Sequence, residues 1–141
     1  MRSTSVDPDL ATSLRLAVAR SARRLRQESG TGLFPSLSAA LTTVELHGPL
    51  TPSGLAARER IQRPTVTRIV CRLEEAGLVT READPGDRRS SLITVTAAGR
   101  GLLADARTRK DAFLAERLAA LTPEDRATLE RAAVLLAGML E

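Results

Sequence analysis

The sequence holds few of the residues that carry catalytic, metal or redox chemistry. It has one cysteine, Cys71, and one histidine, His47. A single cysteine cannot form a disulfide within one chain, so a reducing cytoplasm is the expected location. A structural zinc site takes four ligands, mostly cysteine and histidine, which this chain cannot supply alone. We therefore expect no metal and no cofactor, and because a catalytic triad also has little support, we expect no enzyme activity.

Aromatic residues and long apolar runs are also scarce. Tryptophan and tyrosine are absent, and the phenylalanines are Phe34 and Phe113. Proteins that bind single-stranded nucleic acid stack bases on exposed rings, so the composition disfavours that function. No apolar run approaches the roughly 18 residues of a membrane span, and Met1–Asp9 lacks the apolar core of a signal peptide. We expect neither a membrane segment nor export.

Arginine, in contrast, is abundant. Lys110 is the only lysine among 21 basic residues, the net charge is +4 and the pI is about 10.8. This balance favours an acidic partner, such as nucleic acid or a membrane surface. The alternative is that the abundant arginine and alanine reflect a GC-rich coding sequence. The positions of the arginines are therefore more informative than their number.

Hydrophobic periodicity and turn residues predict a mainly α fold with one small β-hairpin. A length of 141 residues fits one domain with a hydrophobic core. Ser36, Thr51, Thr96 and Thr122 are the expected helix caps. Helices are predicted over about 8–28, 36–47, 52–59, 63–76, 97–120 and 123–140, and strands over about 78–81 and 92–95. Three helices, an arginine-rich helix and a hairpin have the order of a winged helix-turn-helix, and two further helices follow.

The predicted helix 63–76 has one apolar and one polar face. At 100° per residue, its apolar residues fall within an arc of about 100°. They are Val66, Ile69, Val70 and Leu73. Arginine can pair two donors with guanine, and threonine can reach a phosphate or the thymine methyl group, so the polar face could enter a major groove. The alternative is a helix whose charged face is merely solvated. The polar arc holds Pro64, Thr67, Arg68, Cys71, Arg72 and Glu75, with Thr65 near its edge.

The segment Asp84–Arg89 is predicted as a charged loop at the tip of the hairpin. Asp87 could pair with Arg88 or Arg89 and so orient the loop, which leaves the other arginine for a minor groove. The alternative is an ordinary charged turn. A basic hairpin directly after a basic helix is less expected by chance than either feature alone. Together they suit the two grooves of one DNA duplex.

The segment from Ser36 to Gly99, about half of the chain, resembles the MarR family of bacterial winged-helix regulators. An Asp-x-Arg motif at the hairpin tip, followed by a Val-Thr-x-x-Gly motif, is the most diagnostic part of the match. The flanking helices match the family only in length and amphipathic pattern. The matching residues are Gly48–Pro52, Leu55-Ala56, Arg63–Arg68, Leu73–Val79, Asp84–Arg89 and Val95–Gly99.

The resemblance implies a homodimer whose N- and C-terminal helices intertwine. It also implies a repressor of transcription, relieved in many members by a small-molecule effector that binds between the DNA lobe and the dimer helices. The implied domains are 1–35 and 101–141 for dimerisation, on either side of a DNA-binding domain over 36–100. The residues implied for the major groove are Arg63, Thr65, Thr67, Arg68 and Arg72, and those for the wing are Arg88 and Arg89. Candidate interface residues are Leu14, Val18, Leu25, Phe113, Leu118, Leu129, Leu136 and Leu140.

Three residues need separate comment. Arg60 stands in the turn before the recognition helix, where members usually carry glycine, and a non-glycine residue in a left-handed turn costs about 1 kcal/mol. Gln62 replaces the usual serine and is a poorer cap, so both changes bear on the angle of the helix. Cys71 suggests thiol-based sensing. The sensors of this family place their cysteine near the N-terminal helix, so a small side chain beside DNA is the simpler interpretation.

Two other functions fit the same fold. One is a winged helix that binds proteins, which would not need outward arginines on both the helix and the wing. The other is an architectural protein that binds DNA without regard to sequence. A salt titration with specific and random duplexes separates the three possibilities, because phosphate contacts make binding steeply salt-dependent.

Overall fold

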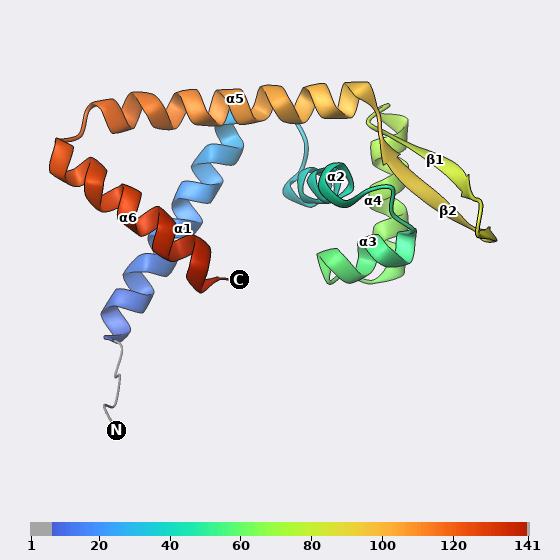
Figure 1. The fold of residues 1–141 in the computed structure, drawn as a ribbon, viewed down its shortest axis with the longest axis horizontal. Coiled ribbons are helices and arrows are strands. Elements are labelled where there is room, and N and C mark those ends of the chain that lie inside the picture. Colours follow the sequence, from blue (N-terminus) through green and yellow to red (C-terminus); the bar gives the residue numbers. More distant parts are fainter. Residues whose placement is uncertain (1–6, 141) are drawn as a thin grey trace. The chain divides into compact units, whose positions relative to one another are not determined.

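The computed structural model describes residues 7–140, which form six helices and one β-hairpin (Figure 1). Two compact units divide the chain. The winged-helix unit is Ser29–Arg107, and the terminal unit joins the residues up to Glu28 to those from Thr108 onward. This architecture confirms the predicted winged helix-turn-helix, mainly α with a small hairpin. The helices are α1 (Pro8–Glu28), α2 (Pro35–His47), α3 (Pro52–Glu59), α4 (Arg63–Glu75), α5 (Ala97–Ala119) and α6 (Pro123–Met139), and the strands are β1 (Val79–Asp84) and β2 (Asp87–Val95).

The core of the winged-helix unit lies between α2, α3, α4 and the hairpin: the three helices contact one another, α2 and α3 contact β2, and α4 contacts β1. Its fully buried side chains include Leu41, Leu55 and Ile93. Burial of one such side chain contributes roughly 1.5–3 kcal/mol, so the core fixes α4 with its polar face outward. The buried residues of α4 are those that the periodicity predicts, Val66, Ile69, Val70 and Leu73.

The hairpin is longer and its loop shorter than predicted. β1 and β2 pair antiparallel, with Val79 opposite Val95 at the base, and they extend away from the three helices α2 to α4 (Figure 1). Only Pro85 and Gly86 lie between the strands, so the predicted loop Asp84–Arg89 is wrong. The outer half of each strand is polar and mostly exposed. The length of the hairpin is set by backbone pairing between β1 and β2, and hydrophobic alternation in the sequence does not reveal this pairing.

Helix α2 begins earlier than predicted. Phe34 occupies the N-cap position without a side-chain hydrogen bond, and Pro35 is the first helical residue. The predicted cap, Ser36, therefore lies inside the first turn, since proline is well suited to a first helical position. The other three predicted caps are confirmed. The hydroxyls of Thr51, Thr96 and Thr122 each accept a hydrogen bond from the backbone N–H three residues later, at 3.0 to 3.1 Å.

A tight junction joins α4, β1 and the start of α5. Gly77 has a φ of +74°, a left-handed conformation that glycine adopts without strain. Its carbonyl oxygen accepts the Thr96 hydroxyl at 2.7 Å, and the Thr96 amide donates to the Leu78 carbonyl at 3.0 Å. These bonds fix the base of the hairpin at the end of α4.

The terminal unit contains α1, the second part of α5, and α6. No residue of α1 or α6, all of which the structure describes, is buried. Large apolar side chains lie at the surface, among them Leu10, Val134 and Met139, which are at least 60% exposed. Within residues 7–140, no helix combines the length and the apolar character that a membrane crossing requires.

Candidate nucleic-acid interface

The polar face of α4 is on the outside of the winged-helix unit. All five residues predicted for a major groove lie off its buried side. Their contacts divide them into two flanks, one next to α3 and β1 and the other next to α2. Arg63, Thr67, Arg68 and Arg72 are exposed, and Thr65 and Cys71 are partly exposed.

On the α3 flank, two of the predicted residues already have partners. The Arg63 guanidinium donates a hydrogen bond to the Ser53 hydroxyl of α3, and the Thr67 hydroxyl donates to the Arg63 carbonyl at 3.1 Å. Nothing in the sequence indicates the Ser53 contact, because it joins two helices across a turn. Arg63 is thus held against α3 at the start of the recognition helix.

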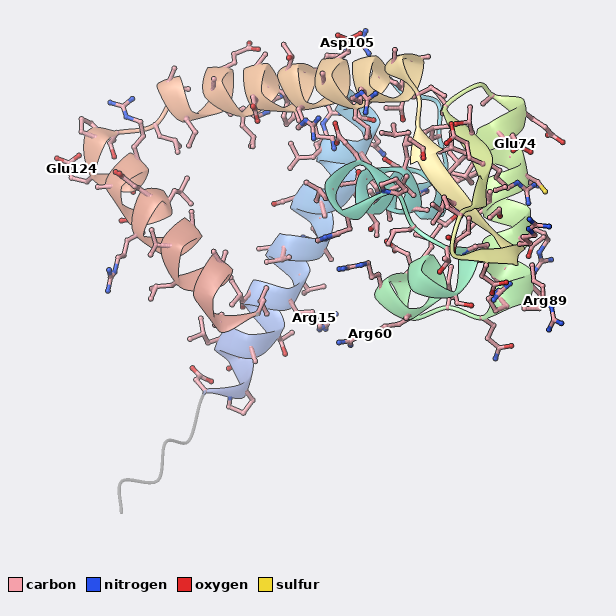
Figure 2. The ribbon with its side chains drawn as sticks, turned by 45° about the vertical axis from the view of Figure 1, so that its right-hand side comes forward. Arg15, Arg60, Glu74, Arg89, Asp105 and Glu124 are labelled. Carbon is pink, nitrogen blue, oxygen red and sulfur yellow. The ribbon has the colours of Figure 1, made fainter. Side chains whose placement is uncertain are left out.

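Further along this flank, Arg81 of β1 forms a bidentate ion pair with Glu74, which is labelled in Figure 2. The Arg81 Nε and Nη2 atoms lie 3.1 and 3.2 Å from the two carboxylate oxygens of Glu74, and Nη2 lies 3.4 Å from Sγ of Cys71. The hydrogen bonds that Arg81 donates to the Glu74 carboxylate raise the pKa of Arg81. Sequence reasoning missed Arg81, since a polar residue on a short strand has no distinctive spacing. Arg81 neutralises the Glu74 carboxylate and links the hairpin to α4.

Cys71 is a free thiol. It is partly exposed on the outer side of α4, and its contact in the described chain is the Arg81 guanidinium. Thiol sensing by Cys71 stays a prediction.

On the α2 flank, Thr65, Arg68 and Arg72 line a cavity of about 220 Å³. Its other wall is the start of α2, at Ser36 and Leu37. Residues four apart lie on the same side of a helix, so the two guanidiniums flank one cavity. Neither guanidinium group makes an ion pair or a hydrogen bond with another residue of the described range 7–140.

The wing arginines are exposed, but they lie in β2 and not in a loop. Because neighbouring residues of a strand point to opposite faces, Arg88 and Arg89 leave the hairpin in opposite directions. Figure 2 shows Arg89 at the edge of the winged-helix unit. The Asp87 carboxylate accepts a hydrogen bond from the Arg89 backbone N–H at 2.9 Å, and the Asp84 carboxylate accepts one from Gly86 at 2.9 Å. Asp87 therefore acts on the backbone of the turn, whereas a side-chain pairing with arginine was predicted.

The turn between α3 and α4 has the left-handed conformation for which the family uses glycine. Arg60 adopts a φ of +54° there, so the turn keeps this shape and Arg60 bears the strain. Gln62 occupies the N-cap position of α4 and, as expected of a poor cap, makes no side-chain hydrogen bond to the helix. A hydrogen bond from the Thr43 hydroxyl to Glu59 joins α2 to α3 just before this turn.

The residues predicted for a subunit interface all lie in the terminal unit. Leu118 and Leu129 are 36% and 47% exposed. Leu25 and Phe113 line a cavity of about 330 Å³, in which the Arg117 guanidinium stacks 3.4 Å from the centre of the Phe113 ring. A larger cavity of about 470 Å³, lined by α1 and α6, includes the other four, Leu14, Val18, Leu136 and Leu140.

A helix-turn-helix with an arginine-bearing second helix, followed by a hairpin, defines the winged-helix class of DNA-binding folds. The MarR family model matches residues 36–91. Over 136 residues the chain is 38% identical to the HTH-type transcriptional regulator Mb0904 of Mycobacterium bovis, a match that covers 96% of this chain and 95% of that protein. The solved structure of a proposed transcriptional regulator of Pseudomonas aeruginosa is 33% identical, with a TM-score of 0.86 and 98% of each chain covered.

The chain therefore belongs to the MarR family of helix-turn-helix transcriptional regulators. The family consists of regulators and not of enzymes. A mutant of S. aureus MepR, solved bound to an oligodeoxyribonucleotide, shares the fold at 18% identity, with a TM-score of 0.72 over 94% of this chain and 98% of that chain.

Proposed function

We propose that this chain is a homodimeric, sequence-specific DNA-binding protein that represses transcription. In the proposed complex, α4 enters the major groove and the β1–β2 hairpin contacts the minor groove. One observation carries the proposal: exposed arginines lie on both elements of one compact unit, Arg68 and Arg72 on α4, and Arg88 and Arg89 on β2. The oligodeoxyribonucleotide bound to MepR, which has the same fold, supports this assignment.

The chemistry of these side chains fits a duplex. A guanidinium pairs two donors with guanine in the major groove or with a phosphate, and the narrow minor groove attracts arginine through its negative potential. Arg88 and Arg89 point to opposite faces of the hairpin. One of them can therefore enter the groove while the other contacts the sugar–phosphate backbone.

The terminal unit supports the homodimer. Its helices α1 and α6 bury no side chain within the described chain, yet both carry apolar residues around one cavity. A second copy could cover this surface with its own identical surface, as in an isologous interface. We therefore propose residues 1–35 and 101–141 for dimerisation and residues 36–100 for DNA binding. The two α4 helices would then reach half-sites roughly 34 Å apart.

Relief of repression by a small-molecule effector belongs to the proposal as well. It is supported by family membership alone. A compound that releases operator DNA from the purified protein, while a control compound of similar size does not, would establish it.

Two arginine variants test the DNA contacts. Duplexes selected from a random pool by the wild type provide the operator. We expect Arg68→Ala to weaken operator binding by about 1–3 kcal/mol and to relax the sequence choice. Arg88→Ala should weaken operator and random duplexes alike. Arg131→Ala, which removes an exposed arginine from α6, is the matched control. Equal binding by the wild type and both variants would contradict the proposed contacts.

A salt titration distinguishes this function from its two alternatives. The proposal predicts steep salt dependence together with a preference for the operator. Equal affinity for operator and random duplexes would instead indicate an architectural protein. Binding without steep salt dependence would indicate a protein-interaction module.

The molecular mass of the protein in solution tests whether it forms a homodimer. Light scattering on the wild type should give about twice the 15.1 kDa of one chain. Leu136→Glu places a charge beside the α1–α6 cavity and should yield single chains. Leu46→Glu, at a residue that is 66% exposed on α2, is the control and should remain dimeric. A wild type that stays at the mass of one chain would rule the homodimer out.

A further inference from the structure

The cavity between α4 and the start of α2 has an unusual lining. Its polar groups are two guanidiniums and two hydroxyls, and none of its lining residues is acidic. The cavity is therefore a concentration of hydrogen-bond donors with a positive charge. Its lining residues are Ser36, Leu37, Thr65, Arg68, Ile69 and Arg72.

No acidic side chain in the described part of the chain neutralises the charges at this cavity. On the other flank of α4, Arg63 is bonded to Ser53 and Arg81 is paired with Glu74. The guanidinium groups of Arg68 and Arg72, in contrast, have neither an ion pair nor a hydrogen bond with any residue from 7 to 140. The nearest acid along the helix face, Glu75, is three residues from Arg72 and makes no ion pair with it. The two arginines are thus free to bind an anion.

The start of α2 also favours binding of an anion at this cavity. Phe34 gives the helix no side-chain cap, and Pro35 has no N–H. The amide of Ser36 is one of the donors that the first turn of a helix leaves without an intrahelical partner. The hydroxyl of Ser36, which does not serve as a cap, adds a further donor at the cavity wall. A thirteen-residue helix also presents the positive end of its dipole there.

We propose that this cavity binds one phosphate of the DNA backbone, held by Ser36 of α2 and Arg72 of α4. The inference rests on the proposed DNA binding and adds a contact to it. It also divides the roles of the α4 arginines. At 100° per residue, Arg68 lies about 150° from the centre of the apolar arc and Arg72 about 110° from it. Arg68 therefore points most directly outward and reads bases, Arg63 is tied to α3, and Arg72 sets the register of α4 on the duplex.

The first test compares substitutions of the two arginines. Arg72→Gln should weaken binding to the selected operator and to a random duplex by the same factor, on the order of tenfold, and lower the salt slope by about 1 per half-site. Arg72→Lys should retain most of the affinity, because a phosphate accepts a point charge, whereas a guanine contact made by the two donors of a guanidinium would lose more of its affinity with lysine. Arg68→Gln should instead reduce the preference for the operator. Arg131→Gln on α6 is the control for the loss of one exposed charge.

The second test locates the phosphate. Operator duplexes carrying one neutral methylphosphonate linkage at a time are bound to the wild type, to Arg72→Gln and to Ser36→Ala. At one position per half-site, the neutral linkage should weaken duplex binding by the wild type. The same linkage should have little further effect on duplex binding by Arg72→Gln or Ser36→Ala. Ser13→Ala, at an exposed serine of α1, should respond like the wild type. Thermal melts confirm that each variant is folded.

Three results would overturn the inference. Arg72→Gln could relax sequence choice, which would make Arg72 a base reader. A second contrary result is that every methylphosphonate linkage weakens Arg72→Gln as much as it weakens the wild type. Ser36→Ala could bind every modified duplex as the wild type does. Failure of the proposed function itself looks different, because the wild type would then bind no duplex with steep salt dependence.

Discussion

Gly99 is the residue whose substitution should most clearly damage the winged-helix unit. It is buried near the start of α5. A Cβ atom at this position would lie 2.3 Å from the carbonyl oxygen of Leu78 and 2.8 Å from Cγ2 of Val95. The Leu78 carbonyl is fixed backbone and accepts a hydrogen bond from the Thr96 amide at 3.0 Å. Alanine at position 99 must therefore push α5 away from the base of the hairpin.

The magnitude follows from three contributions to the free energy of unfolding. Overpacking against backbone costs about 3 kcal/mol, the upper end of its usual range. Weakening of the Thr96–Leu78 hydrogen bond costs about 1 kcal/mol more. Replacing glycine by alanine in a helix stabilises by about 1 kcal/mol. We expect Gly99→Ala to lower the free energy of unfolding by about 3 kcal/mol.

The assay is urea denaturation followed by helical circular dichroism, with Gly101→Ala as the matched control. Gly101 is in the same helix, and no heavy atom lies within 4 Å of where its Cβ would be. This variant should gain about 0.5–1 kcal/mol from helix propensity alone. If Gly99→Ala proved as stable as Gly101→Ala, the close approach of α5 to Leu78 would not be what requires glycine here.

Three smaller effects follow from other contacts. Arg60→Gly should raise the free energy of unfolding by about 0.5 kcal/mol in the same urea assay, because relief of the left-handed strain exceeds the extra entropy of unfolded glycine. The hydrogen bond from Arg107 holds the pKa of Glu45 below its ordinary value of 4.5. This pair therefore stabilises the fold above pH 4.5, and the contribution is lost as the pH falls through the lowered pKa. A series of urea midpoints against pH should show a smaller acid loss for Glu45→Gln than for the wild type. Arg81→Gln should weaken duplex binding in fluorescence anisotropy, since it leaves the Glu74 carboxylate unpaired beside the proposed DNA surface, and a second substitution, Glu74→Gln, should restore much of it.

Each of these expectations has its own contrary result. An unchanged or lower urea midpoint for Arg60→Gly would mean that the left-handed turn is not strained. Parallel pH curves for the wild type and Glu45→Gln would exclude the Arg107 pair as a source of acid sensitivity. If Arg81→Gln and the double variant bound DNA equally weakly, the role of Arg81 would lie in placing the hairpin and not in neutralising Glu74.

Periodicity alone was sufficient to predict which residues of α4 are buried. That helix packs against several elements at once, so its apolar residues follow the helical repeat closely. The threonine caps could be predicted equally well, because the hydroxyl of a cap accepts a hydrogen bond from the backbone N–H only three residues away. Such local relations can be derived from a sequence without knowledge of the tertiary structure.

The hairpin and its contacts could not be derived in this way. The proline and glycine at 85 and 86 marked the turn correctly, but the exposed strand residues on either side have no apolar alternation to show where pairing ends. Arg81 and Ser53 were missed as partners of α4 for a related reason. Each contacts the helix through the tertiary fold, at a separation in sequence that has no fixed spacing.

The terminal helices pose a different problem, because an interface and a core have the same apolar pattern in a sequence. Leu14, Val18 and Leu136 fall on stripes that a core would also require, yet α1 and α6 bury none of their residues in the described chain. Most of the stability of a helix comes from packing of its apolar face, so an uncovered α1 would gain little from folding. In the proposed homodimer, folding of these helices and assembly are therefore one equilibrium, and apparent stability should rise with protein concentration. A monomeric variant in which α1 and α6 stayed fully helical would show that folding of these helices does not depend on assembly of the homodimer.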